Sequence, residues 1–190
     1  MDINLTPILE KKMGTPRPRT RGRYNASELY AITHGFRSGK LTPEQWLHAP
    51  KKTVKEILTM WGGIGIHNQI QDLLNPKYCE NKVEFVYRDI ILVAKADYLP
   101  PENPDEVWEL KTSKKLMTEM KPWQRLQTKL YCTMFEKPVG VVYQPVQDDN
   151  GIYLKDIGRV GRDDGWFQEQ LGLLYSFHLE VEKLWVNLKT

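Results

Sequence analysis

The sequence predicts an α/β fold, in which a single domain is built on a mixed central β-sheet flanked by helices. Its length of 190 residues suits one domain, and 41% hydrophobic residues are enough to fill one sizeable core. Helical and strand-like patterns alternate along the chain, which favours helices packed on a sheet. The chain shows no internal repeat, so we expect an irregular segment at residues 1–23 followed by one domain at residues 24–190.

Helical signals dominate the first half of the chain. Asn25, with Glu28 three residues later, is close to a capping box and predicts a helix that begins there. The tripeptide Thr42-Pro43-Glu44 predicts a second, short helix. Apolar residues that recur at threes and fours predict a third helix over residues 53–74, and the glycines near its middle predict close packing or a bend there.

The centre and the end of the chain contain the strands. Runs rich in β-branched and aromatic residues are separated by turn-forming residues, such as the Pro-rich segment at 100–105. The aromatic residues of the last helix are spaced as a core stripe rather than as a base-stacking platform. We expect strands at residues 82–87, 90–99, 107–111, 139–146 and 152–160, and helices at residues 122–135 and 165–188.

Positive charge is concentrated at the N-terminus, although the net charge of the whole chain is only +3. Prolines interrupt this segment, so it forms neither a helix nor a central strand. We predict a basic flexible arm, which is either solvated or lies on phosphates. Its candidate nucleic-acid-binding residues are Arg17, Arg19, Arg21 and Arg23.

The two cysteines, Cys79 and Cys132, are far apart and form no Cys-x-x-Cys pair. This excludes a zinc site or an iron–sulfur cluster built on cysteines, while a single disulfide stays open. No apolar run approaches the length of a membrane span, and the N-terminus has no apolar signal core. We therefore expect a cytoplasmic protein, or one inside the host cell if it is viral, with no membrane partner.

Two carboxylates and a lysine form the candidate chemical group. Asp97 ends an apolar run, and Glu109 and Lys111 follow across the Pro-rich loop. Side chains alternate along a strand, so Glu109 and Lys111 point to the same side, and the loop lets Asp97 come beside them at the edge of a sheet. Carboxylates bind Mg²⁺, and a lysine places a charge beside the attacking water or the phosphate, as phosphodiester hydrolysis requires. The Glu-x-Lys pattern alone also occurs on many solvated strands.

Two further features lie on helices. His67 is three residues from both Ile64 and Ile70, which predicts that it lies on the inward face of its helix. Gln127 and Tyr131 share a helix face, with Trp123 one turn earlier. Taken alone, His67 fits a satisfied core histidine, and the other three fit an ordinary amphipathic helix.

In this order and spacing, the set resembles the RecB-like branch of the PD-(D/E)XK nucleases, which includes CRISPR-adaptation nucleases and many viral exonucleases. A helical histidine, an aspartate, an acid-x-lysine strand and a Gln-x-x-x-Tyr helix carry the resemblance, which covers about residues 24–145. It implies a restriction-endonuclease-like core. It also implies one or two Mg²⁺ or Mn²⁺ ions bound by His67, Asp97, Glu109 and the Leu110 carbonyl.

The same resemblance assigns roles to the remaining residues. Lys111 would assist the nucleophilic water, while Gln127 and Tyr131 would steer the nucleic-acid strand or support Lys111. Trp123 is a candidate for binding the nucleic acid, and Glu84 a candidate for an extra acid near the site. The implied activity is hydrolysis of single- or double-stranded DNA, with a leaning toward an exonuclease. Several members of the branch hold an iron–sulfur cluster on four cysteines, which this chain lacks.

Two other readings compete with the nuclease. One is a catalytically inactive nucleic-acid-binding or assembly module on the same fold, although a binder has no need of a complete metal-ligand set. The other is an unrelated α/β domain in which these residues are surface charges. The sequence leaves open endonuclease against exonuclease action, strand polarity, DNA against RNA, and the oligomeric state.

Overall fold

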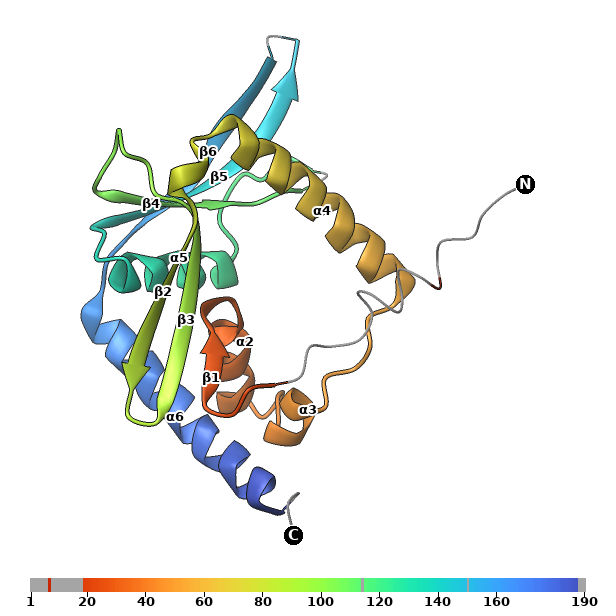
Figure 1. The fold of residues 1–190 in the computed structure, drawn as a ribbon, viewed down its shortest axis with the longest axis vertical. Helices are drawn as coiled ribbons and strands as arrows, with labels where there is room; N and C mark the ends of the chain where they lie inside the picture. The colour runs from red at the N-terminus through yellow and green to blue at the C-terminus, as the bar shows by residue number, and fades with distance from the viewer. Residues whose placement is uncertain (1–6, 8–18, 114, 150, 188–190) are drawn as a thin grey trace.

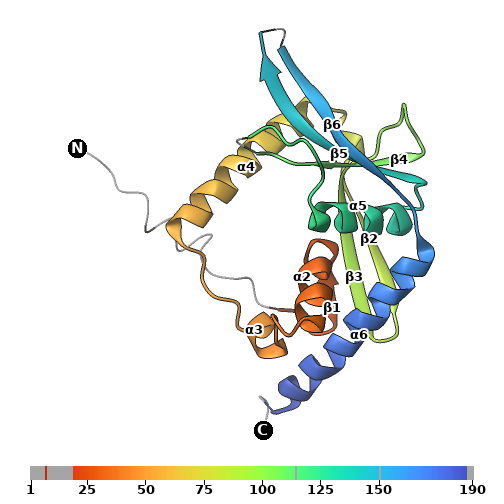
Figure 2. The ribbon, with the colours of Figure 1, turned by 180° about the vertical axis from the view of Figure 1, so that it is seen from behind.

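Six strands form one mixed sheet, and three helices cover one of its faces (Figure 1, Figure 2). The structure, a computed structural model, describes residues 7, 19–113, 115–149 and 151–187. The predicted fold class, an α/β domain with a mixed sheet, is confirmed. In chain order the elements are β1 (Arg23–Asn25), α2 (Ala26–Arg37), α3 (Pro43–Leu47), α4 (Val54–Leu73), the 3₁₀ turn η2 (Pro76–Tyr78), β2 (Cys79–Tyr87), β3 (Ile90–Tyr98), β4 (Glu106–Leu110), α5 (Pro122–Met134), β5 (Val139–Asp148), β6 (Gly151–Gly161) and α6 (Asp164–Asn187).

Strand β3 lies inside the sheet and has neighbours on both sides. Antiparallel β2 pairs with β3 on one side, while parallel β1 and antiparallel β4 share its other side. Strand β5 runs parallel to β4, and β6 runs antiparallel to β5. The expectation that the carboxylates converge at the edge of a sheet is therefore wrong, because β3 and β4 are both paired on two sides.

The main core lies between the sheet and helices α2, α5 and α6, which Figure 2 shows on the near side of the strands. Phe167 and Phe177 of α6 are buried, and the other aromatic residues of that helix pack against the same core, as the spacing predicted. Burying each side chain of this size contributes about 1.5 to 3 kcal/mol. This packing fixes α5, which carries several predicted site residues, against the strands.

A glycine lets α5 approach the sheet closely. A Cβ atom at Gly140 of β5 would lie 2.5 Å from Cγ2 of Thr128 and 2.8 Å from Sγ of Cys132, both on α5. Any larger side chain at residue 140 would push the helix away from the strand. Since Gln127 and Tyr131 lie on α5, this close approach sets how near they come to the carboxylates on β3 and β4.

Helix α4 stands away from the sheet at its start and reaches the sheet near its end (Figure 1). The side chain of Thr53 caps it, and Glu56 completes a capping box. The helix runs through its glycines without a break. A Cβ at Gly63 would lie 3.1 Å from Oγ1 of Thr112, so the predicted close packing occurs at this glycine.

Burial along α4 is uneven: Ile57, near its start, is fully buried. Ile70 is buried, whereas Ile64 is 43% exposed. Of the two isoleucines that predicted an inward face around His67, only Ile70 is therefore buried. The buried Gln71, one turn after His67, donates hydrogen bonds to Oε1 of Glu80 at 3.0 Å and to the backbone oxygen of Asp97 at 3.2 Å. These two bonds tie the end of α4 to β2 and β3.

Two segments differ from the predicted secondary structure. Strand β2 begins at Cys79 instead of residue 82, and the short strand β1 precedes α2. Asn25 is the N-cap residue of α2, but its side-chain amide donates to Glu28 instead of accepting from the helix. The pairing with β3 creates both additional strand segments, and a three-residue strand leaves almost no periodic signal in a sequence.

Cys79 and Cys132 are both free thiols, so no disulfide joins them. In the part of the chain that the structure describes, no helix combines the length and the apolar character needed to cross a membrane.

Candidate active site

Asp97 and Glu109 lie opposite each other on neighbouring strands. Tyr98 of β3 pairs with Trp108 of antiparallel β4, so the next residues along the two strands, Asp97 and Glu109, are also cross-strand neighbours. Oδ2 of Asp97 accepts a hydrogen bond from the backbone N–H of Leu110 at 2.6 Å. The N–H and C=O groups of one strand residue point to the same side, so the Leu110 carbonyl also lies on the Asp97 side of β4.

The Glu109 carboxylate is buried, with 3% of the residue exposed. Its Oε1 contacts the Lys111 ammonium and accepts a hydrogen bond from Nε2 of Gln127 at 3.1 Å. Its Oε2 is buried and has no hydrogen-bond partner among the described residues. A buried polar atom without a partner costs about 1 to 3 kcal/mol, and more when it is charged. A cation is the kind of partner that this oxygen lacks.

Lys111 follows β4 and is held by residues of α5. Its Nζ donates to Oε1 of Gln127 at 3.4 Å, and Nε2 of Gln127 donates to the hydroxyl oxygen of Tyr131 at 2.8 Å. Gln127 and Tyr131 are both buried. Their polar atoms bind within the protein, and a role of these two residues in steering a strand stays a prediction. The geometry agrees with the other predicted role, which is to support Lys111, and it also places Gln127 on Glu109.

Trp123, on the first turn of α5, contacts Lys111 from another side. The Lys111 ammonium lies 5.0 Å from the centre of the Trp123 ring, within the range of a cation–π interaction. Trp123 remains 38% exposed. It is thus the predicted aromatic residue at the site that solvent, or a ligand, can reach.

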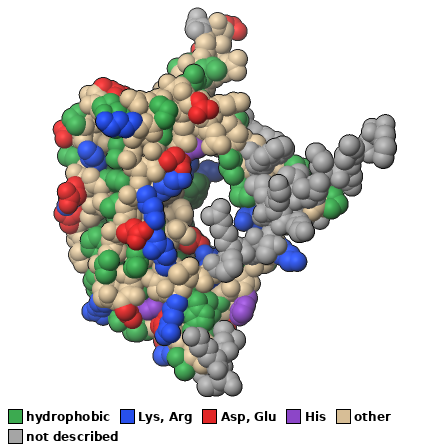
Figure 3. Space-filling view, in the orientation of Figure 1, with side chains coloured by type: hydrophobic (Ala, Val, Ile, Leu, Met, Phe, Trp, Pro, Cys, Tyr) green, Lys and Arg blue, Asp and Glu red, His purple; other side chains and the backbone are tan. Residues whose placement is uncertain are grey.

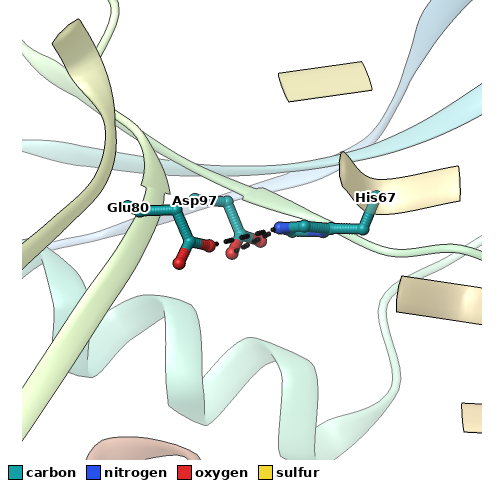
Figure 4. A group of neighbouring side chains, drawn as sticks. All are labelled: His67, Glu80 and Asp97. Atoms are coloured by element: carbon teal, nitrogen blue, oxygen red, sulfur yellow. Dashed lines mark ion pairs between the residues drawn. The ribbon is translucent and has the colours of Figure 1, made fainter. Parts of the chain in front are cut away.

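His67 of α4 points toward the carboxylates of Asp97 and Glu80 (Figure 4). Its Nε2 lies 3.5 Å from Oδ1 of Asp97 and 3.5 Å from Oε1 of Glu80. One ligand atom from each of the three residues lies within 4.8 Å of the others. His67 therefore lies beside Asp97, and Glu80, which the sequence analysis missed, lies beside both.

Burial changes the proton affinities in this group. It raises the pKa of Glu109 to about 8, assisted by the charge of Asp97, and raises the pKa of Asp97 to about 6. Burial also lowers the pKa of His67, so its imidazole is neutral and able to donate a lone pair at neutral pH. Groups with such shifts gather at functional sites, and a bound cation would favour the deprotonated carboxylates.

A cavity of about 580 Å³ opens between α4 and the sheet at this point. Its lining includes His67, Glu80, Lys95, Leu110 and Lys111. Figure 3 shows Lys and Arg side chains along one rim of the hollow on this face of the molecule. His67, Glu80 and Leu110 are therefore reached from this cavity, beside positive charges that suit a phosphate, while the Glu109 carboxylate lies buried next to them.

The acid near the site is Glu80 and not Glu84. Glu84 forms ion pairs with Arg23 and Lys82, away from the candidate ligands. Glu80 lies between Cys79 and Asn81, which pair with Tyr98 and Ala96, so it lies across β2 and β3 from Asp97. The predicted strand began at residue 82 and left Glu80 in a loop, so only pairing β2 back to Cys79 could have found it.

The arginines of the predicted arm are placed against the domain. Arg19 pairs with Glu28 and lies 4.3 Å from the centre of the Trp46 ring. Arg21 pairs with Glu182 of α6, and Arg23 belongs to β1 and pairs with Glu84. Residues 19–23 are therefore part of the domain rather than a free arm, because acidic side chains hold each of these arginines. Arg17 lies outside the described residues.

The chain shares its fold with solved exonucleases, although no family profile and no curated protein sequence matches it. The alkaline exonuclease LHK-Exo from Laribacter hongkongensis superposes with a TM-score of 0.57 and 14% identity over 96% of each chain. LHK-Exo in complex with dAMP gives a TM-score of 0.58 and 15% identity over 88% of this chain and 92% of that chain. A phage-related exonuclease from Haemophilus somnus 129PT gives a TM-score of 0.54 and 10% identity over 89% and 97%. At these identities the likeness is one of fold.

Proposed function

We propose that this protein is a divalent-metal-dependent nuclease that hydrolyses DNA phosphodiester bonds, of the RecB-like PD-(D/E)XK type. The observation that carries the proposal is the buried Glu109 carboxylate beside Asp97, with Oε2 unpartnered and Lys111 on Oε1. An inactive binding module has no need to bury a carboxylate at such cost. A surface of solvated charges would not bury it at all.

The residues present fit Mg²⁺ or Mn²⁺. Asp97, Glu109 and the Leu110 carbonyl offer the oxygen ligands that Mg²⁺ prefers, and the His67 imidazole makes the set equally suitable for Mn²⁺. Oε2 of Glu109 supports this assignment, because it is a buried ligand atom with no hydrogen-bond partner in the part of the chain that the structure describes. When bound, the metal would activate water and neutralise negative charge on the phosphate.

Other residues of the chain have separate roles in the proposed reaction. Lys111 provides a compact positive charge beside the attacking water or the phosphate oxygens, and Gln127 keeps its ammonium in place. The exposed ring of Trp123 offers a surface on which a base or sugar can stack. An exonuclease is the favoured form of the activity, because LHK-Exo and the phage-related protein, which share the fold, are described as exonucleases.

A cleavage assay tests the proposal directly. End-labelled single- and double-stranded DNA should be cut in the presence of Mg²⁺ or Mn²⁺ and left intact in EDTA, with mononucleotide products for an exonuclease. An RNA oligonucleotide of the same sequence measures the preference for DNA. DNA binding without cleavage under any of these metals would favour the inactive module, and full activity after exhaustive chelation would exclude the metal-dependent mechanism.

A further inference from the structure

Glu80 is held at the site by three different groups. Gln71 donates to its Oε1 at 3.0 Å, the Lys95 ammonium pairs with its Oε2, and Nε2 of His67 lies 3.5 Å from Oε1. No other carboxylate on β2 is placed in this way among the described residues, since Glu84 contacts only Arg23 and Lys82 there. The position of Glu80 is thus fixed toward His67 and Asp97 (Figure 4).

The distances around His67 do not describe ordinary hydrogen bonds. Its Nε2 is 3.5 Å from each carboxylate, whereas an N–H···O hydrogen bond spans about 2.7 to 3.2 Å. Ligand atoms around an octahedral ion with bonds of about 2.1 Å are separated by about 3.0 Å when adjacent and about 4.2 Å when opposite. The separations of 3.5 Å lie between these two values, so small side-chain shifts bring all three ligand atoms around one cation.

A second observation points to the same ligand. Glu109, which lies opposite Asp97 on β4, is 3% exposed and has an oxygen without a partner among the described residues. Asp97 lies between the two groups: its Oδ1 faces His67, while its Oδ2 accepts from Leu110 beside Glu109. The unpartnered oxygen and the His67–Glu80–Asp97 group therefore adjoin each other at Asp97.

We propose that Glu80 is a further ligand of the divalent metal, and that Lys95 competes with the metal for the Glu80 carboxylate. This inference rests on the proposed function, since it concerns the metal of that site. Lys95 is attached to β3, it is mostly exposed, and it lines the same cavity as His67 and Lys111. A metal at Oε1, the Glu80 oxygen nearest His67, would withdraw charge from the carboxylate and weaken the Lys95 ion pair at Oε2. The Lys95 ammonium is then more available at the rim, where a phosphate of the substrate is its natural partner.

Two substitutions with opposite expected effects test this inference. Mn²⁺ binding to the full chain is measured by isothermal titration calorimetry. Glu80→Gln should weaken Mn²⁺ affinity about tenfold or more, the scale on which even residues behind the ligands act in metal sites. Lys95→Met should strengthen the affinity several-fold, because it removes the competing cation. A salt bridge that lies away from the metal would leave Mn²⁺ affinity unchanged in both variants.

The chain offers a matched control on the same strand. Glu84 pairs with Lys82 as Glu80 pairs with Lys95, but away from the site. Glu84→Gln and Lys82→Met change the net charge identically, so they should leave Mn²⁺ affinity nearly unchanged. In the double variant Glu80→Gln/Lys95→Met, the gain from Lys95→Met should disappear, because the carboxylate for which it competes is gone.

The result that overturns the inference is a Glu80→Gln protein that binds Mn²⁺ as tightly as the Glu84→Gln control. If Glu80→Gln does not fold, Lys95→Met still decides the matter, and an affinity equal to that of Lys82→Met overturns the competition. The outcome is separable from that of the nuclease proposal. Opposite shifts in Mn²⁺ affinity without cleavage of any nucleic acid would support the ligand and refute the nuclease. Metal-dependent cleavage with unchanged Mn²⁺ affinity in Glu80→Gln would support the nuclease and refute Glu80 as a ligand.

Discussion

The side-chain amide of Gln127 donates to the Glu109 carboxylate at 3.1 Å, so a residue of α5 is bound directly to a candidate metal ligand on β4. Oε1 of Gln127 accepts from Lys111, and Nε2 of Gln127 also donates to the Tyr131 hydroxyl, so both polar atoms of the amide are hydrogen-bonded. Helix α5 can hold this position only because Gly140 allows it to lie close to β5. The charge of Lys111 is thereby fixed relative to the carboxylates.

Substitution of Lys111 should separate binding from chemistry. Lys111→Ala should lower the single-turnover cleavage rate by about two orders of magnitude or more, the scale for loss of one positioned electrostatic group. Metal and DNA affinity should change far less, since Asp97 and Glu109 remain. Lys111→Arg should rescue poorly, because a planar guanidinium does not place a compact charge at the same point. Near wild-type cleavage by Lys111→Ala would remove the lysine from the mechanism.

Asp97→Asn should abolish cleavage while the protein stays folded. Asparagine is nearly isosteric, and its side-chain oxygen can still accept the hydrogen bond from Leu110 that Asp97 accepts at 2.6 Å. The rate should fall by about two orders of magnitude or more, because a neutral amide is a poor ligand for Mg²⁺. Circular dichroism and thermal unfolding provide the control for folding. An active Asp97→Asn protein would show that the metal site has been misplaced.

The stability of the protein in EDTA should depend on pH through Glu109. Its pKa is raised from 4.5 to about 8, so the native state binds more protons than the unfolded chain between these values, and stability falls as pH rises through this window. Glu109→Gln removes this titration. The free energy of unfolding of Glu109→Gln, measured in urea, should exceed that of the wild type by about 1 to 3 kcal/mol at pH 8, the scale for an unsatisfied buried group. At pH 5 the difference should be much smaller. An equal difference at both pH values would contradict the assignment.

Arg19→Ala should affect stability rather than DNA binding. Arg19 pairs with Glu28 and lies over the ring of Trp46, so its loss removes a partly exposed ion pair and a cation–π contact. Together these contribute about 1 kcal/mol. Urea unfolding and a salt series of DNA binding by fluorescence anisotropy measure the two effects separately. A lower DNA affinity with unchanged stability would return Arg19 to the phosphate-binding role that the sequence suggested.

The sequence by itself determined the elements and the central residues of the site. The α/β order and most strand and helix positions follow from periodicity, capping residues and turn residues, which are local signals. The order of His67, Asp97, Glu109 and Lys111 along the chain also lies in the sequence. Alternation along β4 correctly placed Glu109 and Lys111 on one side, and their side chains contact each other in the structure.

Only the tertiary structure decided which side chains of the candidate site are buried and which additional acid lies beside Asp97. Strand pairing placed Glu80 beside Asp97 and moved Glu84 to a pair of basic residues. Packing of α5 buried Gln127 and Tyr131 and placed Gln127 within hydrogen-bond distance of Lys111 and Glu109. These outcomes depend on contacts between residues far apart in the chain, and such contacts leave no periodic trace in the local sequence. Burial, which raises the pKa of Glu109, is likewise a property of the assembled layers.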